Sequence, residues 1–327
     1  MLARELLRAA RLRTLAALVV AATCCVPVSV PGIPAPPIPS NAARVSVGGP
    51  GRGAGQFLRP AGLSFDTFGH LFVSDRGNQR IQEFDEQLRF VREQGGYGFE
   101  PGHFVDPRAV VADRGPRVYV LDTPAGRVQT LDSRREPEAV LFDARPRTGF
   151  AAHRLISMGV DAAGRIFLSD RESQSILVLG PLGDSLGSRG GYGSGPGQFR
   201  RIGGLAAGAT GELWVLDEAR ARLVHLDPAG GFVSEFSVAP DSLKDVSRPS
   251  AVAVSARSLL AVADPGLQQV HLYTPEGALL GELQPPDGAA WDRPTALAWW
   301  GDTLAVADEG TQRVTLFKPA VAVGAPH

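Results

Sequence analysis

The chain has 327 residues, of which 44% are hydrophobic, and its formal net charge at pH 7 is −1. The hydrophobic content excludes a disordered chain, and the near-neutral charge excludes a global electrostatic attraction to nucleic acid. The 39 Gly and 26 Pro residues exceed the usual share and indicate a folded chain with many tight turns.

Residues 1–26 are typical of an export leader. Four arginines precede an uncharged run, Leu15–Val26, which is shorter than the ~20 residues of a membrane span. Cys24 and Cys25 suggest lipid attachment, although Thr23 departs from the small residues that lipoprotein signals prefer. We expect an extracytoplasmic protein that reaches a membrane only through this leader, with an uncleaved amphipathic helix as the alternative.

Residues 27–42 are a Pro-rich linker, residues 43–319 form the expected folded body, and residues 320–327 are a short tail. No cysteine follows Cys25. The body therefore has neither disulfides nor thiolate metal sites.

A motif repeats along the body with a period near 47 residues. It begins as "SDRGNQRI" at Ser74, and its aspartates are Asp75, Asp122, Asp170, Asp217, Asp264 and Asp308. A Gly-rich marker with the same period starts at Gly48, Gly95 and Gly190. No helix is expected after this marker, so we interpret it as a turn and not as a phosphate loop.

Each unit predicts four short strands. In the first unit they are Ala61–Asp66, His70–Asp75, Arg80–Asp85 and Leu88–Glu93, separated by turn residues. Six such units predict an all-β, six-bladed β-propeller, whose sheets bury their faces by stacking around an axis.

The sixth unit lacks a fourth strand. Its strands are Thr295–Trp300, Thr303–Asp308 and Arg313–Lys318, and only a short tail follows. We predict that Ala43–Val47 pairs with Arg313–Phe317, completes the last blade and removes its open edge.

The repeated Asp is expected to face the fifth residue after it across the mouth of a hairpin loop. That residue is Arg in four units (Arg80, Arg127, Arg222 and Arg313) and Ser175 or Gln269 in the others. The Asp can also accept hydrogen bonds from loop amides. A catalytic group is needed only once, whereas a structural joint recurs in every unit. We therefore favour a structural role over a functional ring.

The stretch "GQFLRPAGLSFDTFGHLFVSDRGNQRI" resembles the NHL repeat, most specifically in units one and six and more weakly in units two to five. The resemblance covers residues 43–319 and implies a six-bladed propeller that often serves as a binding platform. Proteins with this repeat include RNA-binding animal proteins, extracellular sensor domains of bacterial kinases and peptide-amidating lyases.

The position before each first strand is rich in arginine and should lie on one rim. Its residues are Arg59, Asp106, Arg154, Arg201, Arg248 and Arg293, with Arg108 beside Asp106 in the second unit. Guanidinium groups pair well with carboxylate and phosphate, so these arginines are candidate ligand-binding residues. The alternative is that each arginine pairs with a local acidic residue and only solvates the rim.

The amidating lyases have histidines near the axis, just after that position. The matching residues here are Ala61, Arg108, Ile156, Gly203, Ser250 and Thr295. We therefore expect a monomeric, non-enzymatic platform that binds a protein, peptide or glycan on its rim, without a catalytic residue or a cofactor. The alternative is a lyase or lactonase with a divalent cation at the axis.

Overall fold

The computed structural model describes residues 45–123, 126–143, 154–285 and 290–319. Within these ranges the chain forms 24 strands and two short 3₁₀ helices, η1 (Arg76–Asn78) and η2 (Asp241–Leu243), and no α-helix. The proposed leader, including Cys24 and Cys25, lies outside the described residues. No helix among the described residues is long and apolar enough to span a bilayer.

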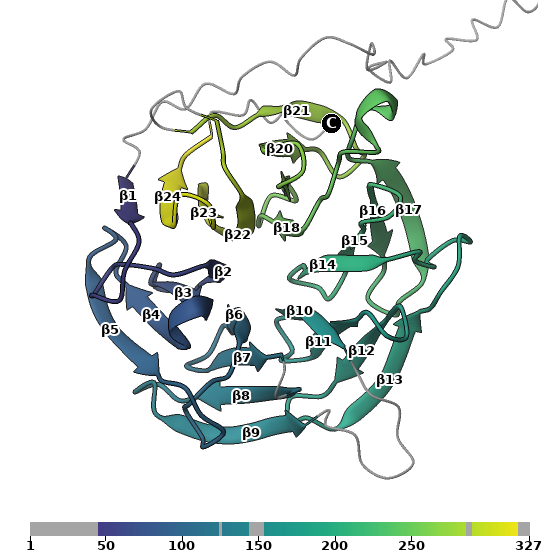
Figure 1. Ribbon diagram of the computed structural model, residues 1–327. Helices are drawn as coiled ribbons and strands as arrows, with labels where there is room; N and C mark the ends of the chain where they lie inside the picture. Colours follow the sequence, from purple (N-terminus) through teal and green to yellow (C-terminus); the bar gives the residue numbers. More distant parts are fainter. Residues whose placement is uncertain (1–44, 124–125, 144–153, 286–289, 320–327) are drawn as a thin grey trace, which may run out of the picture.

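The strands form six antiparallel sheets of four strands, arranged as blades around a central axis (Figure 1). Blade 1 contains β2 (Pro60–Phe65), β3 (Leu71–Asp75), β4 (Arg80–Phe84) and β5 (Phe90–Gly95). Blade 2 contains β6 (Pro107–Ala112), β7 (Val118–Asp122), β8 (Arg127–Leu131) and β9 (Pro137–Asp143). Blade 3 contains β10 (Leu155–Val160), β11 (Ile166–Asp170), β12 (Ser175–Leu179) and β13 (Ser185–Gly190).

Blade 4 contains β14 (Ile202–Ala207), β15 (Leu213–Asp217), β16 (Arg222–Leu226) and β17 (Phe232–Ser237). Blade 5 contains β18 (Ala251–Val254), β19 (Leu260–Asp264), β20 (Gln269–Tyr273) and β21 (Leu279–Glu282). Blade 6 contains β22 (Pro294–Trp300), β23 (Thr303–Asp308), β24 (Arg313–Phe317) and β1 (Val45–Gly48). The fold predicted from the repeat is confirmed.

The last blade is closed by the N-terminal strand, as predicted. β1 pairs antiparallel with β24, so that Val45 lies opposite Leu316 and Gly48 lies opposite Arg313. The Ser46 and Thr315 hydroxyls are 2.8 Å apart and add a side-chain hydrogen bond to this pairing. Segments from the two ends of the body therefore lie side by side (Figure 1).

The hydrophobic core lies between the blades. Six clusters of buried side chains occupy the six blade interfaces, and each draws its residues from two neighbouring blades. Second strands such as β3, β7 and β15 are buried along their whole length because a blade covers each of their faces. A single blade would expose these faces, so the ring is the smallest unit that buries them.

The Gly-rich markers are compact turns that lead into first strands. In the first of them, Phe57 is fully buried and its amide donates to the Gly49 carbonyl at 2.9 Å. Gly51 has φ +152°, and a Cβ there would lie 2.2 Å from Gln56 Oε1, so glycine is required. A strand, not a helix, follows each turn, in agreement with their interpretation as turns.

Candidate functional site

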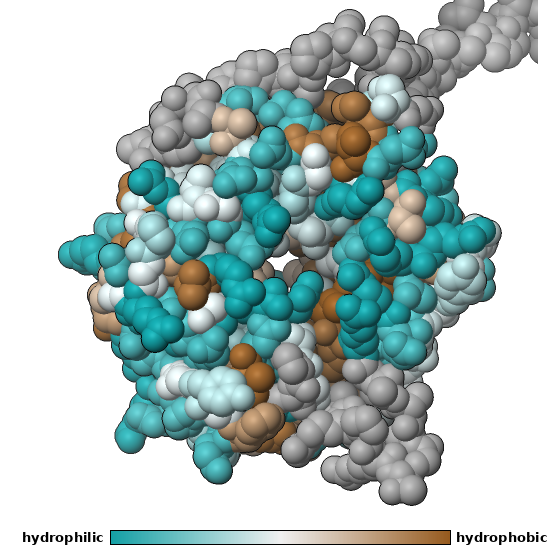
Figure 2. Space-filling view, in the orientation of Figure 1, coloured by the Kyte–Doolittle hydropathy of each residue, from teal (hydrophilic) through white to brown (hydrophobic). Residues whose placement is uncertain are grey.

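The loops between second and third strands, and the turns before first strands, lie on the same face of the ring. We call it the upper face. The inner strands β2, β6, β10, β14, β18 and β22 begin at this face and form the free inner edges of their sheets. They surround a cavity of about 190 Å³ on the axis, and hydrophilic residues surround the central opening in the space-filling view (Figure 2).

Six equivalent residues, one from each blade, lie around the mouth of this axial cavity. Each stands two positions after the predicted rim residue of its blade. They are Ala61, Arg108, Ile156, Gly203, Ser250 and Thr295. All except Gly203 line the cavity, together with Arg76 and Glu309 from the upper loops. A Cβ on Gly203 would lie 2.6 Å from Cγ of Glu218, so the Glu218 side chain occupies the space that this glycine leaves. Arg108 is the single ionisable member of the ring of six.

Most charged groups near the mouth are paired. Arg76 forms an ion pair with Asp106, and Arg171 Nη2 lies 2.5 Å from Glu218 Oε1. Arg201 Nε lies 3.1 Å from the other Glu218 oxygen. Burial raises the pKa of the Glu218 carboxyl, because it outweighs the opposing charges of Arg171 and Arg201.

Arg108 differs from these neighbours. It is half-buried, and its Nε donates to the Ile156 carbonyl of the next blade at 3.0 Å. Within the described part of the chain it has no ion pair with a carboxylate. Burial lowers the pKa of its guanidinium, and the like charges of Arg76 and Arg171 lower it further. The mouth therefore holds a partly desolvated cation beside two others.

The predicted rim arginines Arg59, Arg154, Arg201, Arg248 and Arg293 are all exposed. Arg201 pairs with Glu218, and Arg293 Nη1 lies 3.7 Å from Glu309 Oε2. Among the described residues, neither Arg59 nor Arg154 has a carboxylate partner. Arg108, which we placed among them from the sequence, instead lies inside the axial cavity mouth. Exposed aromatic residues, Tyr97, Phe99 and Tyr192, lie on the turns before β6 and β14, at the same face.

The repeated aspartates act as joints between strands. All six are buried, with exposures of 0 to 4%. Each accepts hydrogen bonds from backbone amides just before the first strand of its own blade; these amides are Leu58, Val105, Asp106, Arg154, Arg200, Arg201, Arg248, Asp292 and Arg293. Each aspartate therefore ties the start of its inner strand to the end of the second strand.

In two of the four units that have an arginine in the repeat, this arginine also bonds the repeated aspartate. In every unit the fifth residue lies opposite the Asp in the strand register. Arg80 and Arg127 bond their aspartates, with Nε to Oδ2 distances of 2.8 and 3.2 Å. Arg222 instead pairs with Glu235, because Arg220 occupies the Asp217 carboxylate. Arg313 is exposed.

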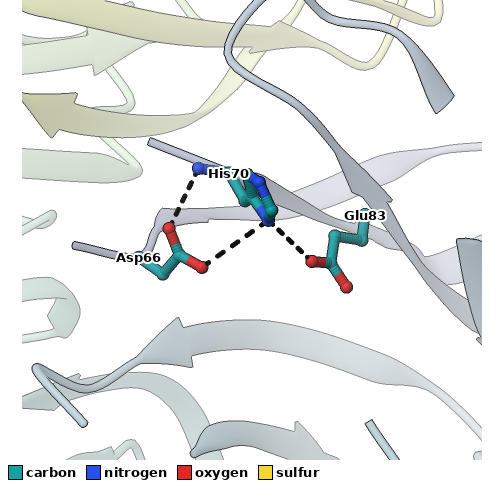
Figure 3. Close-up of side chains that lie close together, drawn as sticks. All are labelled: Asp66, His70 and Glu83. Carbon is teal, nitrogen blue, oxygen red and sulfur yellow. Dashed lines mark hydrogen bonds and ion pairs between the residues drawn. The ribbon is translucent and has the colours of Figure 1, made fainter. Parts of the chain in front are cut away.

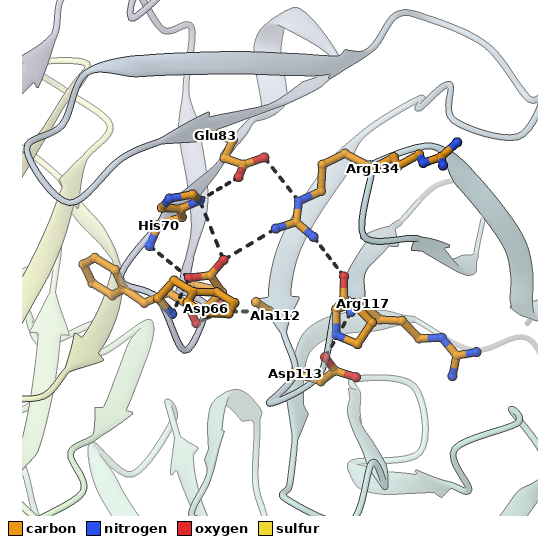
Figure 4. A network of polar contacts seen from close by, with 12 residues as sticks. Asp66, His70, Glu83, Ala112, Asp113, Arg117 and Arg134 are labelled. Atoms are coloured by element: carbon orange, nitrogen blue, oxygen red, sulfur yellow. Dashed lines mark hydrogen bonds and ion pairs between the residues drawn. The ribbon is translucent and has the colours of Figure 1, made fainter.

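A separate cluster, Asp66, His70 and Glu83, has the residue types of a metal site, with ligand atoms within 4.8 Å of one another (Figure 3). His70 Nδ1 lies 2.9 Å from Glu83 Oε1. However, Glu83 Oε2 accepts from Arg92 at 2.9 Å and from Arg135 at 3.2 Å. Figure 4 shows Asp66, His70 and Glu83 within the wider network of polar contacts. Two guanidinium groups already neutralise the two carboxylates, so this network ties blade 1 to the β8–β9 turn of blade 2.

The cluster therefore has a structural function. Burial opposes ionisation of Glu83, but hydrogen bonds from His70 and Arg135 and the charge of Arg92 outweigh it and lower its pKa. Arg135 has φ +64° at a turn position where blades 3, 4 and 5 place Gly183, Gly230 and Gly277. Its contacts across the blade boundary compensate for that left-handed conformation.

His271, on β20, lies far from any such cluster and is only 6% exposed. Burial lowers its pKa to about 4. Between pH 6.5 and 4 the unfolded chain binds a proton here that the folded protein does not. The free energy of unfolding should therefore decrease as the pH is lowered through this window. We expect a loss of about 3 kcal/mol.

The measurement is urea unfolding at pH 7 and pH 4.5 of wild type and His271→Phe. On acidification, His271→Phe should lose less free energy of unfolding than wild type does. The control His103→Gln, at an exposed histidine, should lose as much as wild type. Equal acid sensitivity in wild type and His271→Phe would contradict the prediction.

Sequence reasoning missed four charged residues near the axis: Arg76, Arg171, Glu218 and Glu309. A signal was present, because each directly follows a repeated aspartate. The loop after the second strand ends at the upper face, so the residue after that aspartate is placed near the mouth in every blade. No histidine among the described residues lines the axial cavity.

The profile of the NHL repeat matches residues 57–84, which span β2 to β4 of blade 1. No curated protein matches the chain. Among solved structures, virginiamycin B lyase from Staphylococcus aureus gives a TM-score of 0.56 at 14% identity, over 82% of each chain. A putative gluconolactonase gives 0.62 at 16% identity, over 87% of this chain and 94% of that one.

Regucalcin, a calcium-binding protein from Agrobacterium tumefaciens, gives a TM-score of 0.58 at 13% identity, over 84% of this chain and 95% of that one. At such identities the likeness shows the fold alone. The chain is a six-bladed β-propeller with an NHL repeat in its first blade.

Proposed function

We propose that this propeller is a non-enzymatic, extracytoplasmic binding platform that holds an acidic peptide, protein segment or glycan on its upper face. The observation that carries the proposal is the set of exposed arginines at the starts of the inner strands. Near the mouth, five guanidinium groups (Arg76, Arg108, Arg171, Arg201 and Arg293) face three carboxylates (Asp106, Glu218 and Glu309). This excess of positive charge is local, because the whole chain has a net charge of −1.

The exposed aromatic residues also favour the upper face as a binding surface. Tyr97 is 71% exposed, Phe99 is 59% exposed and Tyr192 is 66% exposed, all on loops of the upper face. Arg and aromatic side chains are enriched at protein interfaces. The Arg200 guanidinium already lies 5.9 Å from the centre of the Tyr192 ring. A partner with carboxylates and flat apolar groups would contact both kinds of side chain.

The alternative function, a lyase or lactonase with a divalent cation at the axis, has less support. The carboxylates near the mouth are engaged by arginines, and the guanidinium groups beside them repel a cation. Metal analysis of the purified protein discriminates between the two functions: one bound ion per chain would favour the enzyme.

The proposal is tested by charge reversal. Arg154→Glu with Arg201→Glu should weaken binding of a labelled hexaglutamate peptide or a galacturonate oligosaccharide by roughly tenfold or more, since two attractive charges become repulsive. The matched control is Arg114→Glu with Arg134→Glu, which makes the same charge change at exposed turns of the opposite face. Fluorescence anisotropy measures both.

Equal affinities of the two double variants for these probes would contradict a binding surface on the upper face. An oligoribonucleotide that binds more tightly than either acidic probe, with a steep dependence on salt, would instead indicate a nucleic-acid platform.

A further inference from the structure

We propose that the axial cavity is a second, separate binding site, which takes a single carboxylate group on Arg108. The site differs from the exposed rim in depth and in composition. Its walls are the inner strands of all six blades, with apolar side chains such as Leu63, Val111 and Leu297 below the mouth. Arg108 is the one lining cation without a carboxylate partner among the described residues, since Arg76 pairs with Asp106, and such a cation above an apolar wall suits a ligand with one anionic end.

Arg108 has the geometry for this role. Its Nε is used by the Ile156 carbonyl, at 3.0 Å. The two terminal nitrogens of its guanidinium have no hydrogen-bond partner among the described residues, and they form the edge that binds a carboxylate through two parallel hydrogen bonds. Arg76 and Arg171 have carboxylate partners of their own.

Burial without a carboxylate partner among the described residues makes Arg108 an unusual group. A half-buried guanidinium is normally paired, because leaving water costs it solvation. Here the neighbouring positive charges add to that cost. A bound carboxylate would supply the missing partner and offset both penalties.

A second polar group lies across the axis. Ser250 lines the same cavity from blade 5, on the far side of the ring from the β6 strand of blade 2 (Figure 1). Its hydroxyl is buried without a hydrogen-bond partner.

Two sources could present such a carboxylate: a small organic acid, or the C-terminus of a peptide. Isothermal titration calorimetry of the full chain should compare hexanoate, N-acetyl-trialanine and its C-terminal amide. Binding of the peptide acid without its amide identifies a peptide C-terminus, and binding of hexanoate alone identifies an organic acid. Binding of none of them, or of the acid and amide equally, would overturn the proposal.

The residue assignment is tested with Arg108→Gln, which keeps a polar side chain but removes the charge. It should weaken binding of the carboxylate by roughly tenfold or more, whereas Arg134→Gln, at an exposed arginine of the opposite face, should not change it. Unchanged affinity in Arg108→Gln would overturn the proposal.

A second variant tests the same site without removing the charge of Arg108. Ala61→Leu places a larger side chain at the equivalent position of blade 1 and should block the cavity without any change in charge. Circular dichroism and the melting temperature establish that each variant is folded, and a folded Ala61→Leu that binds as wild type would also count against the site. Because the charge-reversal pair of the rim leaves Arg108 in place, failure of the platform and failure of this site are distinguishable.

Discussion

A chain that begins at residue 49 should melt at least about 10 °C below one that begins at residue 43. The shorter chain lacks β1 and leaves β24 as an open edge in blade 6. It loses the strand pairing, the Ser46–Thr315 hydrogen bond and the packing of Val47 against a core cluster. A loss of several kcal/mol corresponds to a shift of this size in a domain of about 250 residues.

The longer chain is the matched control, because both lack the leader and the linker and they differ only by the closing strand. Thermal unfolding followed by circular dichroism gives the two melting temperatures, and size-exclusion chromatography detects association through the new edge. Melting temperatures within about 2 °C of each other would show that closure contributes little to stability.

A point substitution tests the seating of β1 without removing it. Gly48 has φ +129°, and a Cβ would lie 2.5 Å from the Gln312 carbonyl oxygen and 2.8 Å from Arg313 Cα. Gly48→Val should therefore push β1 away from β24 and reproduce part of the effect of truncation.

The blades and their closure could be predicted because each depends on local patterns that recur. Alternating strands, turn glycines and the repeated aspartates mark every unit with the same spacing. The missing strand of the sixth unit could be inferred because an unpaired edge is unfavourable and one short segment, at the start of the body, remained unassigned. The observed strand ends one residue later than the predicted segment, because Gly48, not Val47, lies opposite Arg313.

The cavity mouth could not be predicted to the same degree, because its members are defined by differences between units. The sequence placed Arg108 on the rim beside Asp106, although its strand turns it into the axis. Glu218 reaches the mouth because Gly203, on the neighbouring strand of the same blade, leaves room for its side chain. Such pairings depend on the side-chain directions of adjacent segments, which a repeat pattern does not specify.

The cluster of Asp66, His70 and Glu83, at the opposite face, also depends on contacts that the repeat pattern does not specify. In the sequence, His70 begins the predicted strand His70–Asp75 and has no histidine partner at a metal-binding spacing. The structure brings it to Glu83 through the pairing of β3 with β4, and it brings Arg135 from the next blade. Arg92 from the same blade and Arg135 from the next blade together pair the carboxylates with arginine.

Asp75→Ala should destabilise the protein by about 3–5 kcal/mol, because it removes the fully buried carboxylate partner of Arg80 and leaves that arginine only Glu93, whose side chain is partly exposed. Asp75 is fully buried and its two oxygens accept from Leu58 N, Asn78 Nδ2 and Arg80 Nε, at 2.7 to 2.8 Å. Urea unfolding at pH 7 measures the change in the free energy of unfolding.

The matched control is Asp264→Ala, which removes the equivalent aspartate of blade 5, where Gln269 stands in place of the arginine. Its partners include the backbone amides of Arg248, Gly266 and Leu267. Loss of that carboxylate leaves neutral donors unsatisfied, at about 1–3 kcal/mol, so Asp75→Ala should be the more damaging substitution. Adding Arg80→Met to Asp75→Ala should recover part of the loss, because it removes a buried charge that Glu93 alone compensates. If the two single variants were equally unstable and Arg80→Met gave no recovery, the aspartate would act through its backbone contacts alone, and the arginine of the repeat would have no part in the joint.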